Sequence, residues 1–411
     1  MRGSSSPSTP NTKHGETVHS TATIVRTKPG QRLKSLDGLR GVAALVVVVY
    51  HIALTSPSIA ALYLHPSGTS PTTVEWLFFY TPLHLVWAGR EAVVIFFVLS
   101  GFVLALPALQ GRPTIWASYY PRRIARLYIP AIASLCFAFA TVVLLPRVVN
   151  PVSSEWVNDH STSPNGLMQV ILGSSLMGGA GGLNTPLWSL RWEVLFSLLL
   201  PLYILVARKW GSLIWVKATI LIAATVVGGQ TGMLGGALTF LPVFGLGVLM
   251  ASKTDRIADI GKRLGAWSWA ATCALTVLLL TSQWTLGGVV DDLESFRAVS
   301  TGLISIGACL AVFTCAYFRP AVRALETPVV RRLGTISFSL YLVHEPIVIG
   351  SIIALGGNPP LWLAYAVAIP AALAVATAFY WLIEKPSHML SQKMGRLPKA
   401  ALSQGRHTSR G

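Results

Sequence analysis

The chain has 411 residues, of which 53% are hydrophobic and only 11% are charged, and its mean hydropathy is +0.59. Soluble domains carry about 25% charged residues, so this composition excludes an ordinary water-soluble enzyme and indicates a polytopic membrane protein. The net charge of +17 does not indicate nucleic-acid binding, because the basic residues are spread over short loops and the two ends of the chain.

Apolar segments of about 18–20 residues predict ten membrane-spanning helices in an all-α helix bundle. The predicted spans are residues 38–57, 91–109, 128–146, 190–207, 213–228, 232–251, 266–284, 299–318, 335–354 and 361–383. The glycine-rich stretch 166–182 is expected to be an interfacial or re-entrant segment. A membrane domain over residues 35–387 is expected between a disordered basic tail at 1–34 and a second basic tail at 388–411.

The distribution of Lys and Arg predicts which side of the membrane each loop faces. If the N-terminus is cytoplasmic, 28 of the 32 Lys and Arg residues fall on the inner side. Cytoplasmic loops carry such an excess, so both termini are expected in the cytoplasm, with the basic loops against the anionic lipid of the cytoplasmic membrane. The two longer outer loops, 58–90 and 147–189, are placed to cover an outward-facing pocket.

The first predicted span, LDGLRGVAALVVVVYHIAL at residues 36–54, carries both Arg40 and His51. Eleven residues at about 100° each come within about 20° of three full turns, so the two side chains share a helix face about 16 Å apart. If Arg40 lies at the inner boundary, His51 lies near the middle of a hydrocarbon core about 30 Å thick. A neutral imidazole there is a competent general base, although a core histidine bonded to a neighbouring helix fits the spacing equally well. Asp37 can cap the helix start or pair with Arg40.

Three arginines, Arg122, Arg123 and Arg126, precede the third predicted span on its inner side. The spacing of Arg123 and Arg126 places two guanidinium groups on one helical face, where they suit a phosphate. A basic stop signal at the inner membrane boundary explains the same residues.

Polar residues also occur inside other predicted spans, where each is costly unless paired or exposed to a polar cavity. PLWSLRWEVLFSLLLP places Glu193 about one turn into a span, where it could pair with Arg191 or orient a histidine. SFSLYLVHEPI places His344 and Glu345 toward the outer part of another span. FFVLSGF contains Ser100 followed by a glycine, a pattern that favours close helix packing or a kink.

At these residues the chain resembles the acyltransferase-3 family of integral membrane acyltransferases, over about residues 35–387. The Arg–His pair of the first span, FFVLSGF, RRIAR, PLWSL, SFSLYLVHEP and the closing IEKP at 383–386 follow in the family's order. The resemblance implies transfer of an acyl group, commonly acetyl, from cytoplasmic acyl-CoA to a hydroxyl group, often on a sugar. The stretch WSLRWEVLFSLL retains Glu193 but departs from the family's usual WSLSVEEQFYLL, which leaves the acceptor class open.

The resemblance also implies roles for individual residues. His51 matches the histidine regarded as essential for catalysis, and Arg123 and Arg126 match the paired arginines linked to donor binding. The expected catalytic residues are therefore His51, Arg40 and Glu193, the expected donor-binding residues Arg122, Arg123 and Arg126, and the expected supporting residues Asp37, Ser100, Tyr341 and His344.

The function expected from the sequence is that of a membrane O-acyltransferase with His51 as base, using acyl-CoA, most simply acetyl-CoA, as co-substrate and no metal. Its expected acceptor is a carbohydrate or glycoconjugate, and an acyl-histidine intermediate is the mechanistic rival. Acylation of a lipophilic small molecule such as a macrolide antibiotic is an alternative, as is transfer to a separate outer enzyme. A proton-coupled transporter is an alternative of a different class, because histidine and glutamate at mid-membrane depth can relay protons.

Overall fold

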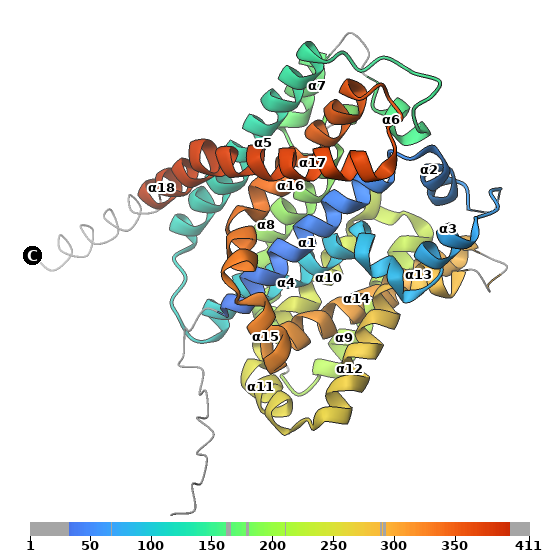
Figure 1. Cartoon of the computed structure of the whole chain (residues 1–411). Helices are drawn as coiled ribbons and strands as arrows, with labels where there is room; N and C mark the ends of the chain where they lie inside the picture. The colour runs from blue at the N-terminus through green and yellow to red at the C-terminus, as the bar shows by residue number, and fades with distance from the viewer. Residues whose placement is uncertain are drawn as a thin grey trace, which may run out of the picture. The chain divides into compact units, whose positions relative to one another are not determined.

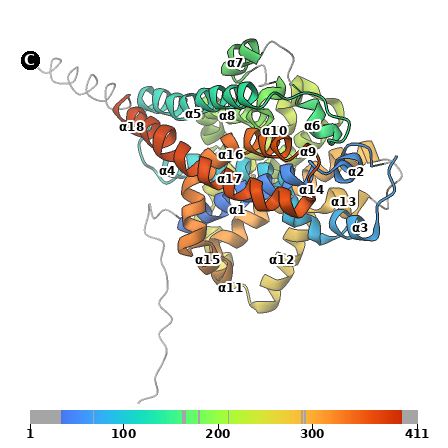
Figure 2. The same cartoon turned by 45° about the horizontal axis from the view of Figure 1, so that its top comes forward.

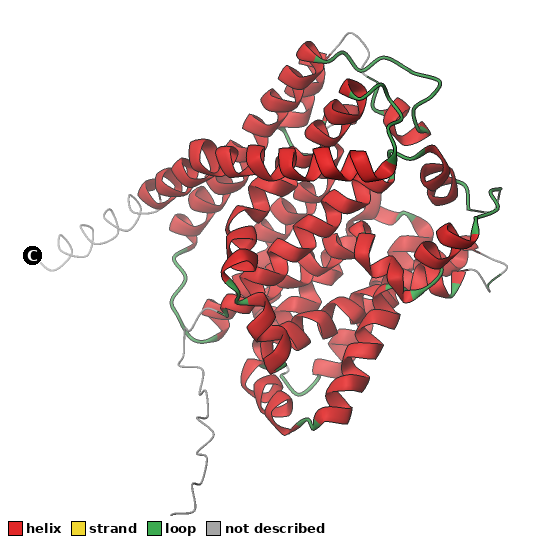
Figure 3. Ribbon diagram, viewed as in Figure 1, coloured by secondary structure: helices red, strands yellow, loops and turns green. Residues whose placement is uncertain are grey.

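The structure is a computed structural model of the chain, and it describes residues 33–66, 68–161, 166–177, 181–209, 211–287, 290 and 293–394. The regular elements in these residues are helical, and no strand occurs among them (Figure 3). The predicted all-α fold is confirmed. The α-helices are α1 (Lys34–Ala53), α2 (Pro57–Leu64), α3 (Thr73–Phe79), α4 (Gly89–Leu109), α5 (Trp116–Leu144), α6 (Glu155–Asp159), α7 (Gly166–Ser174), α8 (Trp188–Arg208), α9 (Ile214–Thr231), α10 (Ala237–Ser252), α11 (Thr254–Arg263), α12 (Ala266–Leu280), α13 (Ser282–Thr285), α14 (Leu293–Tyr317), α15 (Arg319–Leu325), α16 (Pro328–Ala354), α17 (Leu361–Phe379) and α18 (Lys385–Met394). The short turns are η1 (Pro82–Trp87), η2 (Gly181–Leu183), η3 (Thr185–Leu187), η4 (Met233–Gly236) and the π-helical η6 (Tyr380–Glu384).

Eight helices in the described part of the chain are long and apolar enough to cross a membrane, and there are nine if the bent pair α10–α11 counts as one span. The eight are Lys34–Ala53, Gly89–Leu109, Trp116–Leu144, Thr185–Arg208, Ile214–Thr231, Phe296–Tyr317, Pro328–Ala354 and Leu361–Met394. The predicted count of ten is higher because it includes two short helices. With 15 residues, α12 is only about 22 Å long, less than a hydrocarbon core of about 30 Å. α10 has 16 residues and meets α11 at 74°.

The two longer outer loops predicted from the sequence contain short helices. Residues 58–90 form most of α2, then α3, η1 and the start of α4, while residues 147–189 include α6, α7, η2 and η3. The stretch 166–182 contains the nine-residue α7, too short to span a membrane, and its residues 178–180 lie outside the described residues. Residues 1–32 and 395–411 of the predicted tails also lie outside the described residues.

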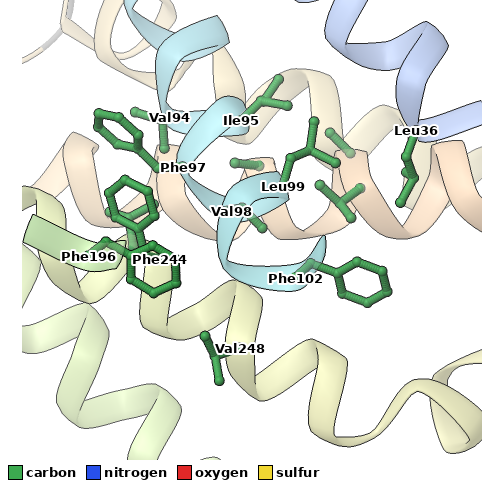
Figure 4. Close-up of a cluster of buried hydrophobic side chains, with 14 of the residues drawn as sticks. Leu36, Val94, Ile95, Phe97, Val98, Leu99, Phe102, Phe196, Phe244 and Val248 are labelled. Atoms are coloured by element: carbon green, nitrogen blue, oxygen red, sulfur yellow. The ribbon is translucent and has the colours of Figure 1, made fainter. Parts of the chain in front are cut away.

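Helix α1 packs along α16, α4 and α17, and α4 packs along α10 (Figures 1 and 2). The interface of α4, α8 and α10 is filled by phenylalanine side chains (Figure 4). Phe244 stacks on Phe97 and on Phe196, with ring centroids 4.5 Å apart in each pair. This packing holds α4 and α8 in fixed positions relative to each other, and both carry residues predicted for the site.

Two glycines allow α4 and α10 to touch through their backbones. A Cβ atom added at Gly101 would lie 2.0 Å from the carbonyl oxygen of Phe244, and one added at Gly247 would lie 2.1 Å from that of Val98. Close approach of this kind is typical of membrane helix pairs with small residues at the interface. It confirms the structural role expected for the glycine after Ser100.

Replacing Gly101 by alanine is therefore expected to destabilise the fold by about 1–3 kcal/mol, the usual cost of overpacking. The added methyl group would have to push two helix backbones apart, because its nearest neighbour is a carbonyl oxygen. Thermal unfolding in detergent measures the effect. Gly265→Ala is the matched control, since nothing lies within 4 Å of a Cβ atom at that position. Equal unfolding midpoints for the two variants would contradict the prediction.

Candidate active site

His51 lies in the last turn of α1 and is 9% exposed. Its Nδ1 atom is 2.9 Å from the backbone oxygen of Val47 and 3.1 Å from Nε2 of His344 on α16. The other ring nitrogen of His344, Nδ1, is 2.9 Å from the oxygen of Tyr341 and 3.1 Å from that of Leu340. Since carbonyl oxygens only accept hydrogen bonds, Nδ1 of His344 carries a hydrogen and its Nε2 accepts one. Nδ1 of His51 is then the donor, and its Nε2 keeps a lone pair.

The carboxylate of Glu345 faces this lone pair. Its Oε2 atom is 3.7 Å from Nε2 of His51, and Glu345 is fully buried. Thr185, the first residue of η3, donates its backbone N–H to Oε1 over 2.7 Å and its hydroxyl to Oε2. A carboxylate held in this way stabilises positive charge that forms on the imidazole.

A third histidine comes from the loop 147–189, which the sequence predicts on the outer side. Nε2 of His160 lies 3.6 Å from Oε1 of Glu345, so this carboxylate lies between two histidines. His160 is 4% exposed, its Nδ1 lies 2.6 Å from the oxygen of Trp156, and the Trp156 ring lies 5.4 Å from that of His51. We call this group the histidine cluster; it consists of His51, His160, His344 and Glu345.

Arg147 links the beginning of the loop that carries His160 to residues near the end of the same loop. Its guanidinium is buried and donates to the backbone oxygens of Gly182 and Leu183 over 3.1 and 3.4 Å. Burial lowers the pKa of Arg147, and the negative charge of Glu345 opposes this shift. This loop packs against the histidine cluster through Trp156 and His160.

A cavity lies among α1, α4, α5, α8 and α16. Its polar lining consists of Arg40, Ser100, Arg123, Arg126, Ser189, Glu193, Ser337 and Tyr341. We call it the arginine cavity. Arg122, predicted together with Arg123 and Arg126, is exposed, does not belong to this lining, and donates from Nε to the oxygen of Ser118 one turn earlier.

Glu193 pairs with an arginine of another helix. It forms an ion pair with Arg123, and the two side chains are only 14% and 11% exposed. Ser100 donates to the same carboxylate oxygen over 3.0 Å. The alternative pairing with Arg191 is wrong, because residues two apart on a helix do not face each other. Arg191 instead lies over the ring of Trp192, 4.3 Å from its centroid.

Tyr341 connects the arginine cavity to the histidine cluster. Its side chain lines the cavity, and its ring centroid lies 5.9 Å from that of His344. Its hydroxyl donates to the oxygen of Pro186 over 3.0 Å and lies 2.7 Å from Oγ of Ser189.

Comparison with known proteins identifies the family. The family model described as an acyltransferase domain, Acyl_transf_3, matches residues 33–381. The chain belongs to the acyltransferase-3 family. The family resemblance found in the sequence motifs is confirmed, and the protein is a multi-pass membrane acyltransferase.

This acyltransferase has curated relatives in several bacteria. It is 28% identical over 334 residues to the acyltransferase MdmB of Streptomyces mycarofaciens, covering 76% of this chain and 78% of that protein. It is 25% identical over 346 residues to nodulation protein 10 of Rhizobium leguminosarum bv. viciae, covering 77% and 88%. It is 24% identical over 394 residues to the putative peptidoglycan O-acetyltransferase YrhL of Bacillus subtilis, covering 88% of this chain and 56% of that protein. No solved structure matches the chain.

The acyltransferase gathers its predicted site residues into two groups. His51, Tyr341 and His344 lie at the histidine cluster, whereas the arginine cavity holds Arg40, Ser100, Arg123, Arg126 and Glu193 as well as Tyr341. Asp37 lies in the first turn of α1. The sequence did not single out Glu345 as the partner of His51, although it directly follows His344 in a quoted motif. It gave no signal that His160 or Thr185 would join this cluster.

Proposed function

We propose that this acyltransferase moves an acyl group, most simply acetyl, from cytoplasmic acyl-CoA to a hydroxyl group of a carbohydrate or glycoconjugate. The observation that carries the proposal is the position of His51. Its Nε2 faces the buried Glu345, and the cluster adjoins a cavity lined by three arginines. These are the two parts that an acyl-CoA-dependent transfer needs, a base for the acceptor and cationic groups for the donor's phosphates.

The arginine cavity supplies the donor site in this proposal. Guanidinium groups bind phosphate through paired hydrogen bonds. Arg123 still has N–H groups available for a phosphate after it pairs with Glu193 and Ser197. The pantetheine arm then extends past Tyr341 and brings the thioester to His51. Because CoA is cytoplasmic, the cavity is placed on the inner side of the cytoplasmic membrane, in agreement with the predicted N-in, C-in orientation.

The proposed reaction needs one proton acceptor. Nε2 of His51 removes the proton from the acceptor hydroxyl while its oxygen attacks the thioester carbonyl. The new C–O bond forms, the C–S bond breaks, and the proton passes from Nε2 to the departing CoA sulfur. Glu345 stabilises the imidazolium in between. The proposed step is base catalysis, and an acyl-histidine intermediate is its mechanistic rival.

Two observations support a carbohydrate acceptor. The relative YrhL is named a putative peptidoglycan O-acetyltransferase, and the loop that carries His160 faces outward in the predicted N-in, C-in orientation, toward the side where surface glycans lie. The direct test supplies acetyl-CoA labelled in its acetyl group to the purified protein in detergent, together with candidate glycan acceptors. Label must enter the glycan as an ester, whereas unchanged acetyl-CoA under these conditions contradicts the proposal.

Replacing Arg126 by alanine is expected to raise the KM for acetyl-CoA about tenfold with little change in kcat, since a hydrogen bond to a charged group contributes about 1.5–3 kcal/mol. Arg126 lines the cavity, whereas Arg122, on the same helix, does not. Arg122→Ala is therefore the matched control and should keep the wild-type KM. An equal rise in both variants would show that these arginines act through general surface charge alone.

A further inference from the structure

A second cavity, of about 300 Å³, lies outside the arginine cavity. Loop 58–90 contributes Thr69, Trp76 and Tyr80 to its lining, and the segment from α13 to the start of α14 contributes Gln283, Trp284 and Arg297. We call it the aromatic cavity. Its size falls at the lower end of the range for small-molecule sites, roughly 300–1,000 Å³, and no step of the proposed reaction uses it.

The walls of the aromatic cavity combine flat apolar faces with a few polar groups. Trp284 is 5% exposed and meets Tyr80 edge-on, with ring centroids 6.4 Å apart, while Trp76 is half exposed. Gln283 is also buried, and its side-chain oxygen accepts a hydrogen bond from Arg90 over 3.3 Å.

This combination matches a sugar ring. A pyranose has one or two faces of C–H groups that lie flat against an aromatic ring, and a rim of hydroxyls that need donors and acceptors. A lipid tail would cover Trp76 but would offer nothing to the polar side chains of Gln283 and Arg297, which also line the cavity.

Aromatic side chains connect this cavity directly to the candidate base. The ring of Trp284 lies 5.2 Å from Tyr63, that of Tyr63 lies 5.3 Å from Tyr50, and that of Tyr50 lies 4.8 Å from His51. Three successive ring contacts therefore link Trp284, in the lining of the aromatic cavity, to His51. A saccharide chain that extends from the cavity along these rings would lead toward His51.

We propose that the aromatic cavity is an acceptor subsite that binds a saccharide ring next to the sugar that receives the acyl group. This inference rests on the proposed function and narrows the class of acceptor to saccharides. It also locates the part of the protein that holds the acceptor saccharide. The half-exposed Trp76 stacks on the ring, while Gln283 and Arg297 bond its hydroxyls.

The test compares Trp76→Ala with Trp362→Ala, an exposed tryptophan at the start of α17 that does not line the cavity. Full-length protein in lipid nanodiscs is applied to an array of oligosaccharides from bacterial cell surfaces. We expect the wild type and Trp362→Ala to bind the same glycans. Trp76→Ala should bind them about tenfold more weakly, and Arg297→Ala should also bind them more weakly. All four proteins should share one KM for acetyl-CoA.

Absence of glycan binding by the wild type, or equal binding by Trp76→Ala and Trp362→Ala, overturns the subsite. His51-dependent acetyl transfer to an acceptor other than a glycan would leave the proposed reaction intact while overturning the subsite. Conversely, Trp76-dependent glycan binding without any turnover of acetyl-CoA would support the subsite and contradict the acyl transfer. The two proposals therefore fail in different measurements.

Discussion

Replacing His51 by alanine is expected to lower the rate of acetyl transfer by about 10²–10⁴-fold, the share that a positioned general base supplies. In the proposed reaction Nε2 of His51 is the atom that takes the acceptor's proton. His344 is not expected to replace it, because its side chain is fully buried and its Nδ1 is held by two backbone oxygens. The KM for acetyl-CoA should stay close to the wild-type value, since the donor's phosphates bind at the arginines.

The measurement is the initial rate of label transfer from acetyl-CoA by purified protein of matched thermal stability. His65→Ala serves as the control: His65 is exposed and pairs with Glu155 on the surface, 2.9 Å away. Since removal of buried His51 also removes packing against His344, His51→Gln provides a second variant of more similar size. A rate within twofold of wild type in both His51 variants would exclude the base role.

Some of this site follows from helix geometry alone. The eleven-residue spacing in α1 and the three-residue spacing in α5 predicted that Arg40 and His51, and Arg123 and Arg126, would each share a helix face. Both pairs lie on continuous helices, and Arg40, Arg123 and Arg126 meet in one cavity. Such predictions succeed because the rotation per residue of an α-helix is nearly constant.

Contacts between helices could not be predicted from the rotation per residue of a single helix. The partner of His51 is Glu345, almost 300 positions later, and the partner of Glu193 is Arg123 on α5. A periodic apolar pattern tells which residues are buried in a soluble helix, but a membrane helix is apolar on nearly all sides, so its sequence does not fix its rotation toward its neighbours. The sequence thus identified the polar residues that are energetically costly inside a membrane, but it did not show which of them pair with each other.

Loop residues were the hardest to predict. His160 and Thr185 reach Glu345 from α6 and η3, whose positions depend on how Arg147 and the surrounding loop fold over the bundle. Neither has a periodic context from which a facing direction could be derived. Conversely, α12 was predicted as a membrane span because its residues are apolar. Hydropathy does not show where a helix ends, and the 15 residues of α12 are too few to cross the membrane.

Glu345→Gln is expected to lower kcat about 100-fold and to leave the KM for acetyl-CoA unchanged. Glutamine keeps the size of the side chain and can still accept the hydrogen bond from the Thr185 backbone, but it removes the negative charge 3.7 Å from Nε2 of His51. Two unit charges at that distance interact by about 4 kcal/mol at an effective dielectric constant of 20. A loss of roughly 2.7 kcal/mol of that stabilisation in the transition state corresponds to a hundredfold lower rate.

Glu193→Gln makes this prediction specific, because Glu193 was the carboxylate that the sequence placed among the catalytic residues. In the structure it pairs with Arg123 in the arginine cavity, so its neutral variant should change the KM for acetyl-CoA more than kcat. Steady-state kinetics of both variants, with Glu155→Gln as a surface control, separates the two roles. If Glu193→Gln loses kcat while Glu345→Gln keeps it, then Glu193 rather than Glu345 supports the base, and the donor and base sites proposed here must be exchanged. Loss of kcat in Glu345→Gln together with a changed KM in Glu193→Gln would mean that the charge facing Nε2 makes His51 a base, while Glu193 acts at the donor site.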